Sequence, residues 1–313
     1  MNRQPPLLLA FAPVLPALGK VGVFSVPLEV VPAKAGIAFA RDLEELGYSA
    51  VWTGEGLGTR ELFTNAAAVL AGTEKIVWGA GIVNIWARDP VTTVTATNTL
   101  NESYDNRFLL GLGISHREQV DPRGHVYGKP IDVMRSYLHE MANLNFVSPL
   151  PPETAQTTPV QHILAALGKP MLRLAAEASH GAHPIMTTPE HTAQARAILG
   201  PDKLLVPAQP FILSTDASEA RRIGRAALTW YLGTENFRRS FLAQGFSEED
   251  LDTKSDHLVD SIVAWGDESA IRDHVKRHLD AGADHVPVQA VSLDPLDLCT
   301  ESYRRVAAAL LEL

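Results

Sequence analysis

The sequence predicts an α/β protein, a (β/α)8 TIM barrel with an insertion after the fourth strand, in which residues 1–313 form a single domain. Three observations lead to this prediction. Along nearly the whole chain, a short β-branched or apolar run is followed by a loop containing glycine and by an amphipathic helix, as in parallel sheets. The repeat supplies eight strands. No linker-like change of composition interrupts it, which favours one closed barrel over two domains.

The first half of the chain contains four of these strands. The first helix begins near Pro32, carries apolar residues at helical spacing and stops at Gly47. Residues 75–83 are continuously apolar, which suits a strand buried on both faces. Pro90 fits the first turn of the helix that follows. The expected strands are residues 20–24, 50–53, 75–83 and 107–112, and the later helices are expected at 63–71 and 90–104.

Residues 116–160 interrupt the repeat, because they are rich in proline, histidine and charged residues around one expected helix, from Ile131 to Asn143. We expect this insertion to lie over the active-site face. The repeat resumes with strands at residues 162–166, 182–186, 204–213 and 284–290. Helices are expected at 170–179, 190–199 and 217–232, then two more before the last strand, and a capping helix at 303–311.

Composition and charge exclude several classes of function. The formal charge of −9 and the absence of a Lys/Arg-rich run argue against nucleic-acid binding. Cys299 is the only cysteine, so no internal disulfide can form, and we expect a reducing cytoplasm. No apolar run reaches the roughly 20 residues that a membrane span needs. Prolines break the apolar residues 1–19, so we expect a lead-in that packs against the barrel rather than a secretory signal.

The ends of the predicted strands are the first place to search for chemistry, because barrel enzymes carry their reactive groups there. Strand two ends with Glu55, which is either an exposed loop residue or a functional carboxylate. Strands three and four end in the glycine-containing stretches 79–90 and 111–116. Such glycines mark a close approach by a backbone or a ligand, and a flat ring could use that space. Tight strand packing explains Gly-x-Gly as often as a cofactor does.

Other catalytic patterns are weak. Residues 166–171 lead strand five into a helix whose free N–H groups, with Lys169, could hold an anion, or they are simply a tight turn. The 11 histidines lack metal-ligand spacing, so no metal site is predicted. No Gly-x-Ser-x-Gly motif is present, and Cys299 is far from any strand end. Arginines 221, 222 and 225 share a helix face that favours solvent over a phosphate.

Several ordered segments resemble the luciferase-like flavin and deazaflavin barrels, from about Leu18 to Leu313. Residues 81–84 followed by Arg88-Asp89-Pro90 look like the pattern of methylenetetrahydromethanopterin reductase and its relatives. The amino-acid sequence of residues 84–90, 111–116 and 123–130 is similar to that of an actinobacterial group of probable F420-dependent oxidoreductases. Residues 166–171 and 281–285 match family patterns too.

The resemblance implies an oxidoreductase that transfers a hydride between coenzyme F420 and a small apolar or conjugated substrate. It also implies a non-proline cis peptide between Gly81 and Ile82 that backs the cofactor ring. By the same resemblance, the residues expected to border the ring are Asn84, Gly111, Gly113, Ser115 and His116, and those expected near the cofactor phosphate are Gly168 and Lys169. Relatives commonly dimerise, so a homodimer is expected.

One departure from the family pattern concerns proton transfer. Many relatives carry an acid–histidine pair after strand two, whereas this chain has Glu55 and Gly56 there. Glu55 or His116 would then take over proton transfer, since either side chain can act as a general acid or base. The large residues Trp52 and Trp86 suit a hydrophobic substrate, although Trp86 is equally suited to packing against the insertion.

Two other functions are compatible with these motifs. One is an FMN-dependent monooxygenase of the same barrel, because both cofactors present a similar ring. The other is a non-catalytic barrel that binds a flavin-like molecule, which the missing histidine keeps open.

Overall fold

The computed structural model describes residues 15–143 and 160–313. Expectations for residues 1–14 and 144–159 lie outside the described residues. Leu15 and Leu18 belong to the expected lead-in, and both pack against buried side chains of the barrel interior. For these two residues, the expected packing of the lead-in is confirmed.

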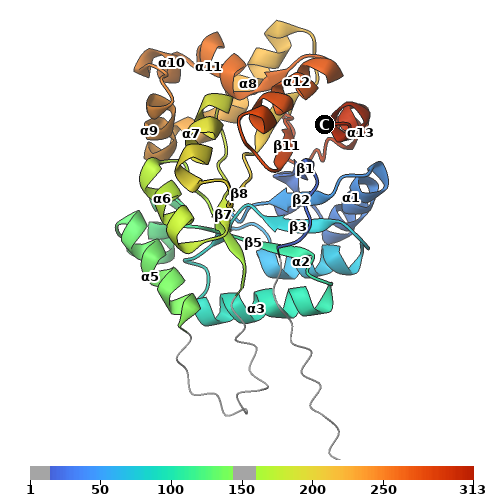
Figure 1. Cartoon of the computed structure of the whole chain (residues 1–313). Coiled ribbons are helices and arrows are strands. Elements are labelled where there is room, and N and C mark those ends of the chain that lie inside the picture. The colour runs from blue at the N-terminus through green and yellow to red at the C-terminus, as the bar shows by residue number, and fades with distance from the viewer. Residues whose placement is uncertain (1–14, 144–159) are drawn as a thin grey trace, which may run out of the picture.

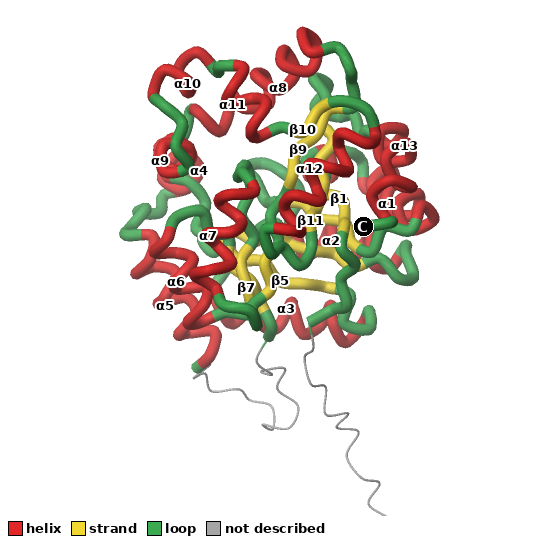
Figure 2. Tube along the Cα trace, turned by 45° about the horizontal axis from the view of Figure 1, so that its top comes forward, coloured by secondary structure: helices red, strands yellow, loops and turns green. Residues whose placement is uncertain are grey.

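The strands pair in parallel and close into a barrel, which confirms the predicted fold class. Figure 2 shows them at the centre of the molecule with helices around them. In pairing order they are β10 (Ala264–Trp265), β9 (Gln209–Ile212), β11 (Val286–Ala290), β1 (Val21–Phe24), β2 (Ala50–Thr53), β3 (Val77–Ala80), β5 (Phe108–Gly113), β6 (His162–Leu164), β7 (Gly181–Ala182) and β8 (Leu204–Leu205), with β4 (Val83–Asn84) beside β5. The strands β8 and β9 belong to one run of chain. Because β8 pairs with β7 and β9 pairs with β11, this run closes the barrel.

Two predicted strands are each divided in the structure. The strand expected at residues 75–83 consists of β3 and β4, with a bulge at Gly81 and Ile82 between them. The strand expected at residues 204–213 consists of β8 and β9. Pro207 lies between these two and has no N–H to donate to a ladder.

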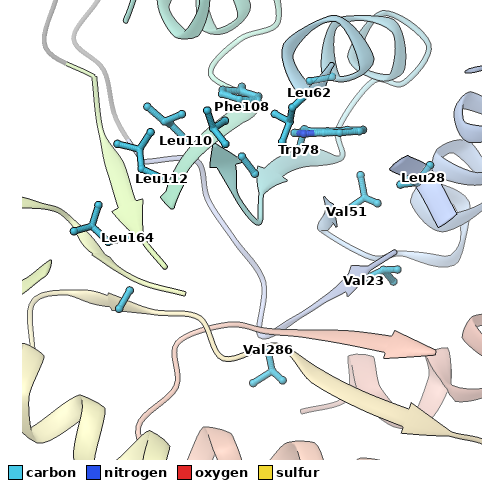
Figure 3. Packing of buried hydrophobic residues seen from close by; sticks show 14 of the residues in the cluster. Val23, Leu28, Val51, Leu62, Trp78, Phe108, Leu110, Leu112, Leu164 and Val286 are labelled. Carbon is cyan, nitrogen blue, oxygen red and sulfur yellow. The ribbon is translucent and has the colours of Figure 1, made fainter. Parts of the chain in front are cut away.

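Side chains along the strands alternate between the barrel interior and the layer beneath the helices. Phe24 and Trp52 belong to the inner cluster, whereas their neighbours Val23 and Val51 belong to the outer core. Figure 3 shows part of this outer core, with Val23 and Val51 among its labelled side chains. Burying one such side chain contributes roughly 1.5 to 3 kcal/mol, so the alternation fixes which residues point inward.

Eight helices form a ring around the strands (Figure 1). They are α1 (Ala33–Leu46), α2 (Leu62–Ala71), α3 (Pro90–Ser103), α5 (Pro130–Ala142), α6 (Lys169–Ala178), α7 (Pro189–Leu199), α12 (Glu268–Asp280) and α13 (Thr300–Leu311). Each contacts the next, and α13 returns to α1. The helix expected within the insertion is therefore the regular fourth ring helix, α5. The described part of the insertion precedes it and contains only α4 (Arg117–Val120) and a 3-10 turn at Asp121–Arg123.

A second excursion follows β9, and Figures 1 and 2 both show it grouped on one side of the molecule. It consists of α8 (Ala217–Leu232), α9 (Glu235–Ala243), α10 (Glu248–Thr253) and α11 (Asp256–Ile262), and it leads into β10. The expectation of two helices between α8 and the last strand was wrong, because four helices and β10 lie there. Helices as short as α10 and α11 carry too few turns to show a periodicity.

Arg221 joins two helices of this excursion. Its guanidinium pairs with Asp256 at 3.0 Å and with Asp260 at 2.6 Å, which ties α8 to α11. Because Arg221 is engaged in these ion pairs, it is not available to bind a phosphate, as the sequence predicted. Within the described ranges, no helix is both long and apolar enough to cross a membrane.

Candidate active site

The chain bulges between β3 and β4 at the carboxyl end of the barrel. The peptide bond between Gly81 and Ile82 is cis, as expected from the resemblance. A Cβ added to Gly111 would lie 1.9 Å from the carbonyl oxygen of Ala80, and one added to Gly113 would lie 2.3 Å from the Ile82 side chain. These two glycines of β5 therefore make room for the bulge itself. Their place at the border of a bound ring stays a prediction.

Aromatic side chains of the protein fill the barrel beneath the bulge. A Cβ on Gly79 would lie 2.2 Å from the Trp52 indole, and one on Gly81 would lie 2.7 Å from Nε2 of His183. The rings of Trp52 and His183 stack with centroids 5.0 Å apart, and the Trp52 indole N–H donates to Nε2 of His285 at 3.1 Å. Trp52 is completely buried. The expectation that it lines the substrate mouth is therefore wrong, because its side chain points into the barrel.

Glu55, one of the two expected acid–base residues, is held by Arg88. Two Arg88 nitrogens donate to its carboxylate, at 2.9 and 2.5 Å, and the backbone N–H of Asn84 donates to Oε2 at 2.8 Å. The Glu55 and Arg88 side chains are each only 9% exposed. Arg88 also pairs with Glu61 at 2.8 Å and lies over the Phe63 ring. A carboxylate engaged by a bidentate guanidinium is poorly placed to exchange protons with a substrate.

Asn84 and Trp86 connect the bulge to the insertion. The buried Asn84 accepts a hydrogen bond from the Trp86 amide through Oδ1, at 3.0 Å. The Trp86 indole donates to the carbonyl of Ile114 at 3.0 Å. Its ring lies 5.5 Å from that of His125 and 6.4 Å from that of Tyr127. The alternative that Trp86 packs against the insertion is therefore confirmed.

Ser115 and His116 follow β5 directly. Ser115 has a φ of 59°, in the left-handed region that is uncommon for residues other than glycine, and its hydroxyl bonds to Gln119 at 3.2 Å. The His116 ring lies 5.4 Å from that of Trp230 and 5.5 Å from that of Phe237. Burial lowers the pKa of His116 below its usual value. The α8–α9 excursion thus covers a neutral His116 at the barrel mouth.

Gly168 and Lys169 lie at the beginning of α6, and both are exposed. A Cβ on Gly168 would meet only the Pro170 ring, at 3.7 Å. Lys169 forms no ion pair with any residue in the described ranges. The beginning of α6 is therefore exposed, as an anion site requires, although a tight turn alone also explains this geometry.

Two neighbouring strands carry buried polar atoms without partners among the described residues. Ser25 Oγ follows β1, and Gln289 Oε1 lies near the end of β11. Gln209 Oε1 of β9 is also unpartnered, but Gln209 is in register with Val288 of the outer core and donates to the Ile262 carbonyl at 2.9 Å, so its side chain faces the helix layer. Nε2 of His183, directly after β7, is also unpartnered. Buried polar atoms are nearly always satisfied in folded proteins, so this end of the barrel suits a bound molecule with polar edges.

Glu29, in the loop after β1, is a candidate that the sequence did not single out. It ends a 3-10 helix, Pro27–Glu29, and its Oε1 accepts a hydrogen bond from the Gly54 amide at 3.2 Å. Burial is the main cause that raises its pKa to about 7, and the charge of Glu55 adds to the effect. Its position after a strand was the only signal in the sequence, and no motif surrounds it.

Comparison with known proteins decides the family. Residues 18–285 match the luciferase-like monooxygenases. The chain belongs to this family. Over 93 residues it is 26% identical to a 5,10-methylenetetrahydromethanopterin reductase of Methanolobus tindarius, and over 96 residues it is 29% identical to a putative coenzyme F420-dependent oxidoreductase of Mycobacterium tuberculosis. Each match covers 30% of this chain, and they cover 28% and 27% of those relatives, less than a third of their length.

Solved structures share the luciferase-like fold over almost the whole chain. An F420-dependent secondary alcohol dehydrogenase bound to an F420–acetone adduct has a TM-score of 0.68 and 14% identity, over 94% of this chain and 99% of that one. The FMN complex of the oxygenating constituent of 3,6-diketocamphane monooxygenase from Pseudomonas putida has a TM-score of 0.72 and 14% identity, over 95% and 99%. At such identities the likeness shows the fold alone.

Five histidines of the protein are buried. Burial lowers their pKa from the usual 6.5 to about 4 or, for one, about 3. These buried histidines are His162, His183, His274, His278 and His285. Within the residues that the structure covers, no group of three or more histidine, cysteine or acidic side chains could hold a metal ion.

Proposed function

We propose that this luciferase-like protein is an F420-dependent oxidoreductase that transfers a hydride between the deazaflavin and a small apolar or conjugated organic substrate. The observation that carries the proposal is the bulge at Gly81 and Ile82, together with the unpartnered buried polar atoms of Ser25 after β1 and Gln289 near the end of β11. Hydroxyl and amide groups are suited to the polar edges of a planar heterocycle. The residues present therefore fit such a cofactor.

F420 over FMN is supported by the chain's own motifs. The bulge and the Arg88-Asp89-Pro90 segment resemble those of F420-dependent proteins, and one sequence relative is named a putative coenzyme F420-dependent oxidoreductase. When bound, F420 supplies two electrons to carbon as a hydride. The bulge at Gly81 and Ile82 would back its ring. Asn84, Ser115 and His116 would border it, and Gly168 and Lys169 would approach its phosphate.

The rim of the barrel mouth supports an apolar substrate. Seven of the exposed large apolar side chains among the described residues lie in loops after strands or in the α8 excursion: Val26, Val30, Leu57, Val126, Trp230, Leu293 and Leu296. The loops around the mouth therefore offer apolar side chains to an apolar substrate.

An FMN-dependent monooxygenase is the second candidate, supported by the TM-score of 0.72 to a barrel solved with FMN. Parallel titration of the purified protein with F420 and with FMN, followed by ring fluorescence, separates the two. Micromolar F420 binding with weak FMN binding, and oxidation of reduced F420 by an apolar carbonyl or conjugated compound, are the expected results. Preference for FMN would favour the monooxygenase, and binding of neither would favour a barrel without redox chemistry.

The same family relationship leads us to infer a homodimer. Light scattering of the purified protein tests this: a mass near twice the 33.9 kDa of one chain is expected, and a mass near 33.9 kDa would contradict it.

A further inference from the structure

Glu29 is anchored beside the bulge by one hydrogen bond to its backbone and one to its side chain. Its carbonyl oxygen accepts a hydrogen bond from the Arg60 amide at 2.9 Å. Its side-chain Oε1 accepts one from the Gly54 amide at 3.2 Å. The loop after β1 is therefore tied to the loop after β2, and the carboxyl group has a defined place.

The carboxyl group of Glu29 occupies space left by two glycines after β2. A Cβ on Gly54 would lie 2.9 Å from Oε1 of Glu29 and 3.1 Å from the carbonyl oxygen of Gly81. A Cβ on Gly56 would lie 3.4 Å from Oε2 of Glu29. The carboxyl group and the bulge therefore border the same small space. A larger side chain at position 56 would compete with Glu29 for it.

The two carboxyl groups at this end of the barrel have opposite surroundings. Arg88 neutralises Glu55, whereas Glu29 has no ion pair within residues 15–143 and 160–313. The charge of Glu55 after β2 and the burial of Glu29 both favour an uncharged Glu29, whereas the backbone amides of Gly54 and Gly56 act in the opposite direction. Tyr231 of α8 also lies within reach, and burial and the Glu29 charge raise its pKa, so it is itself uncharged near pH 7. Of the two carboxyl groups, Glu29 is therefore the one that is free to exchange a proton.

We propose that Glu29 is the acid–base residue of the reaction. This inference rests on the proposed hydride transfer. Once a hydride, with its two electrons, has passed from a bound reduced deazaflavin to one carbon of a C=O or conjugated C=C bond, the carboxylic acid of Glu29 would give a proton to the other atom of that bond. One C–H bond and one O–H or C–H bond form, and the Glu29 carboxylate is reprotonated from water.

The first test needs no cofactor. Because the folded-state pKa of Glu29 is raised from 4.5 to about 7, its protonation favours folding below pH 4.5, and this contribution is lost as the pH rises through 7. Glu29→Gln removes the titration. The urea midpoint of Glu29→Gln should therefore rise relative to that of the unaltered protein from pH 5 to pH 8 and then level off. Glu45→Gln, at an exposed glutamate, should run parallel to the unaltered protein. Parallel behaviour of Glu29→Gln would overturn the inference.

The second test uses turnover. General acid–base groups typically contribute about 10²- to 10⁴-fold. Glu29→Gln should lower kcat by about that factor with little change in KM, and it should remove the limb of the pH–rate profile near pH 7. Glu29→Asp should restore part of the rate. If F420 turns over and Glu29→Gln keeps the full rate, this inference alone fails. If the unaltered protein neither binds nor oxidises reduced F420, the proposed function fails and this inference falls with it.

Discussion

Replacing Arg88 by methionine is expected to destabilise the protein strongly. The substitution leaves Glu55 as a buried carboxylate whose remaining partner is the backbone N–H of Asn84. Removing one partner of a buried ion pair costs about 3 to 5 kcal/mol, and the lost pair with the half-exposed Glu61 adds less than about 1 kcal/mol. Unfolding entropy near 2.1 cal/mol/K per residue gives about 0.7 kcal/mol/K for a chain of this length. We therefore expect the thermal midpoint to fall by roughly 5 to 8 °C.

The assay is differential scanning calorimetry or circular dichroism at pH 7.5, on single and double variants. Combining Arg88→Met with Glu55→Gln removes the stranded charge, so the double variant should be more stable than Arg88→Met alone. Glu61→Gln is the matched control and should shift the midpoint by less than about 2 °C. A shift below about 1 °C for Arg88→Met, or strictly additive effects in the double variant, would refute the reasoning.

Three further predictions concern the site and the core. Gly81→Ala puts a Cβ 2.7 Å from Nε2 of His183, so we expect the thermal midpoint to fall by roughly 2 to 5 °C and F420 binding to weaken, whereas Gly168→Ala should leave the midpoint unchanged. Lys169→Ala should weaken F420 binding roughly two- to fivefold in a fluorescence titration, whereas Lys34→Ala, at an exposed lysine of α1, should not. The five buried histidines bind protons less readily in the folded chain, so their contribution to stability should be full above pH 6.5 and fall towards pH 4, by up to about 1.4 kcal/mol per pH unit for each, as measured by urea midpoints of Glu29→Gln, in which Glu29 does not titrate.

Each of these predictions has an outcome that contradicts it. Equal midpoints for Gly81→Ala and the unaltered protein would mean that the core beneath the bulge yields more readily than its contacts indicate. Equal losses of affinity on replacing the two lysines would show a general charge effect rather than contact at α6. Constant urea midpoints between pH 6.5 and pH 4 would mean that the buried histidines titrate as they do in water.

The barrel could be predicted from the sequence because strand and helix periodicities repeat locally. The eight strand regions and the beginning of α6 follow from runs of a few residues each. The family resemblance also predicted the cis bond between Gly81 and Ile82, which the structure has. Short elements such as α10 and α11 carried too little periodicity to be recognised, and Trp52 was placed at the mouth although its register turns it inward.

The chemical state of the site could not be predicted, because it depends on contacts between loops that are distant in the sequence. Glu55 meets Arg88 across 33 positions, and Glu29 meets Gly54 across 25. Neither contact leaves a pattern in the chain. A sequence shows a carboxylate after a strand, but only the folded loops show that one carboxylate is paired and the other is not.

The most direct test of the central claim is a crystal structure of the protein grown with F420. We predict deazaflavin density against the bulge at Gly81 and Ile82, with the polar ring edge within hydrogen-bond distance of Ser25 or Gln289. The phosphate should lie at the beginning of α6. Clear density for F420 elsewhere on the barrel, or an F420-soaked crystal with both side chains still unpartnered, would contradict the account.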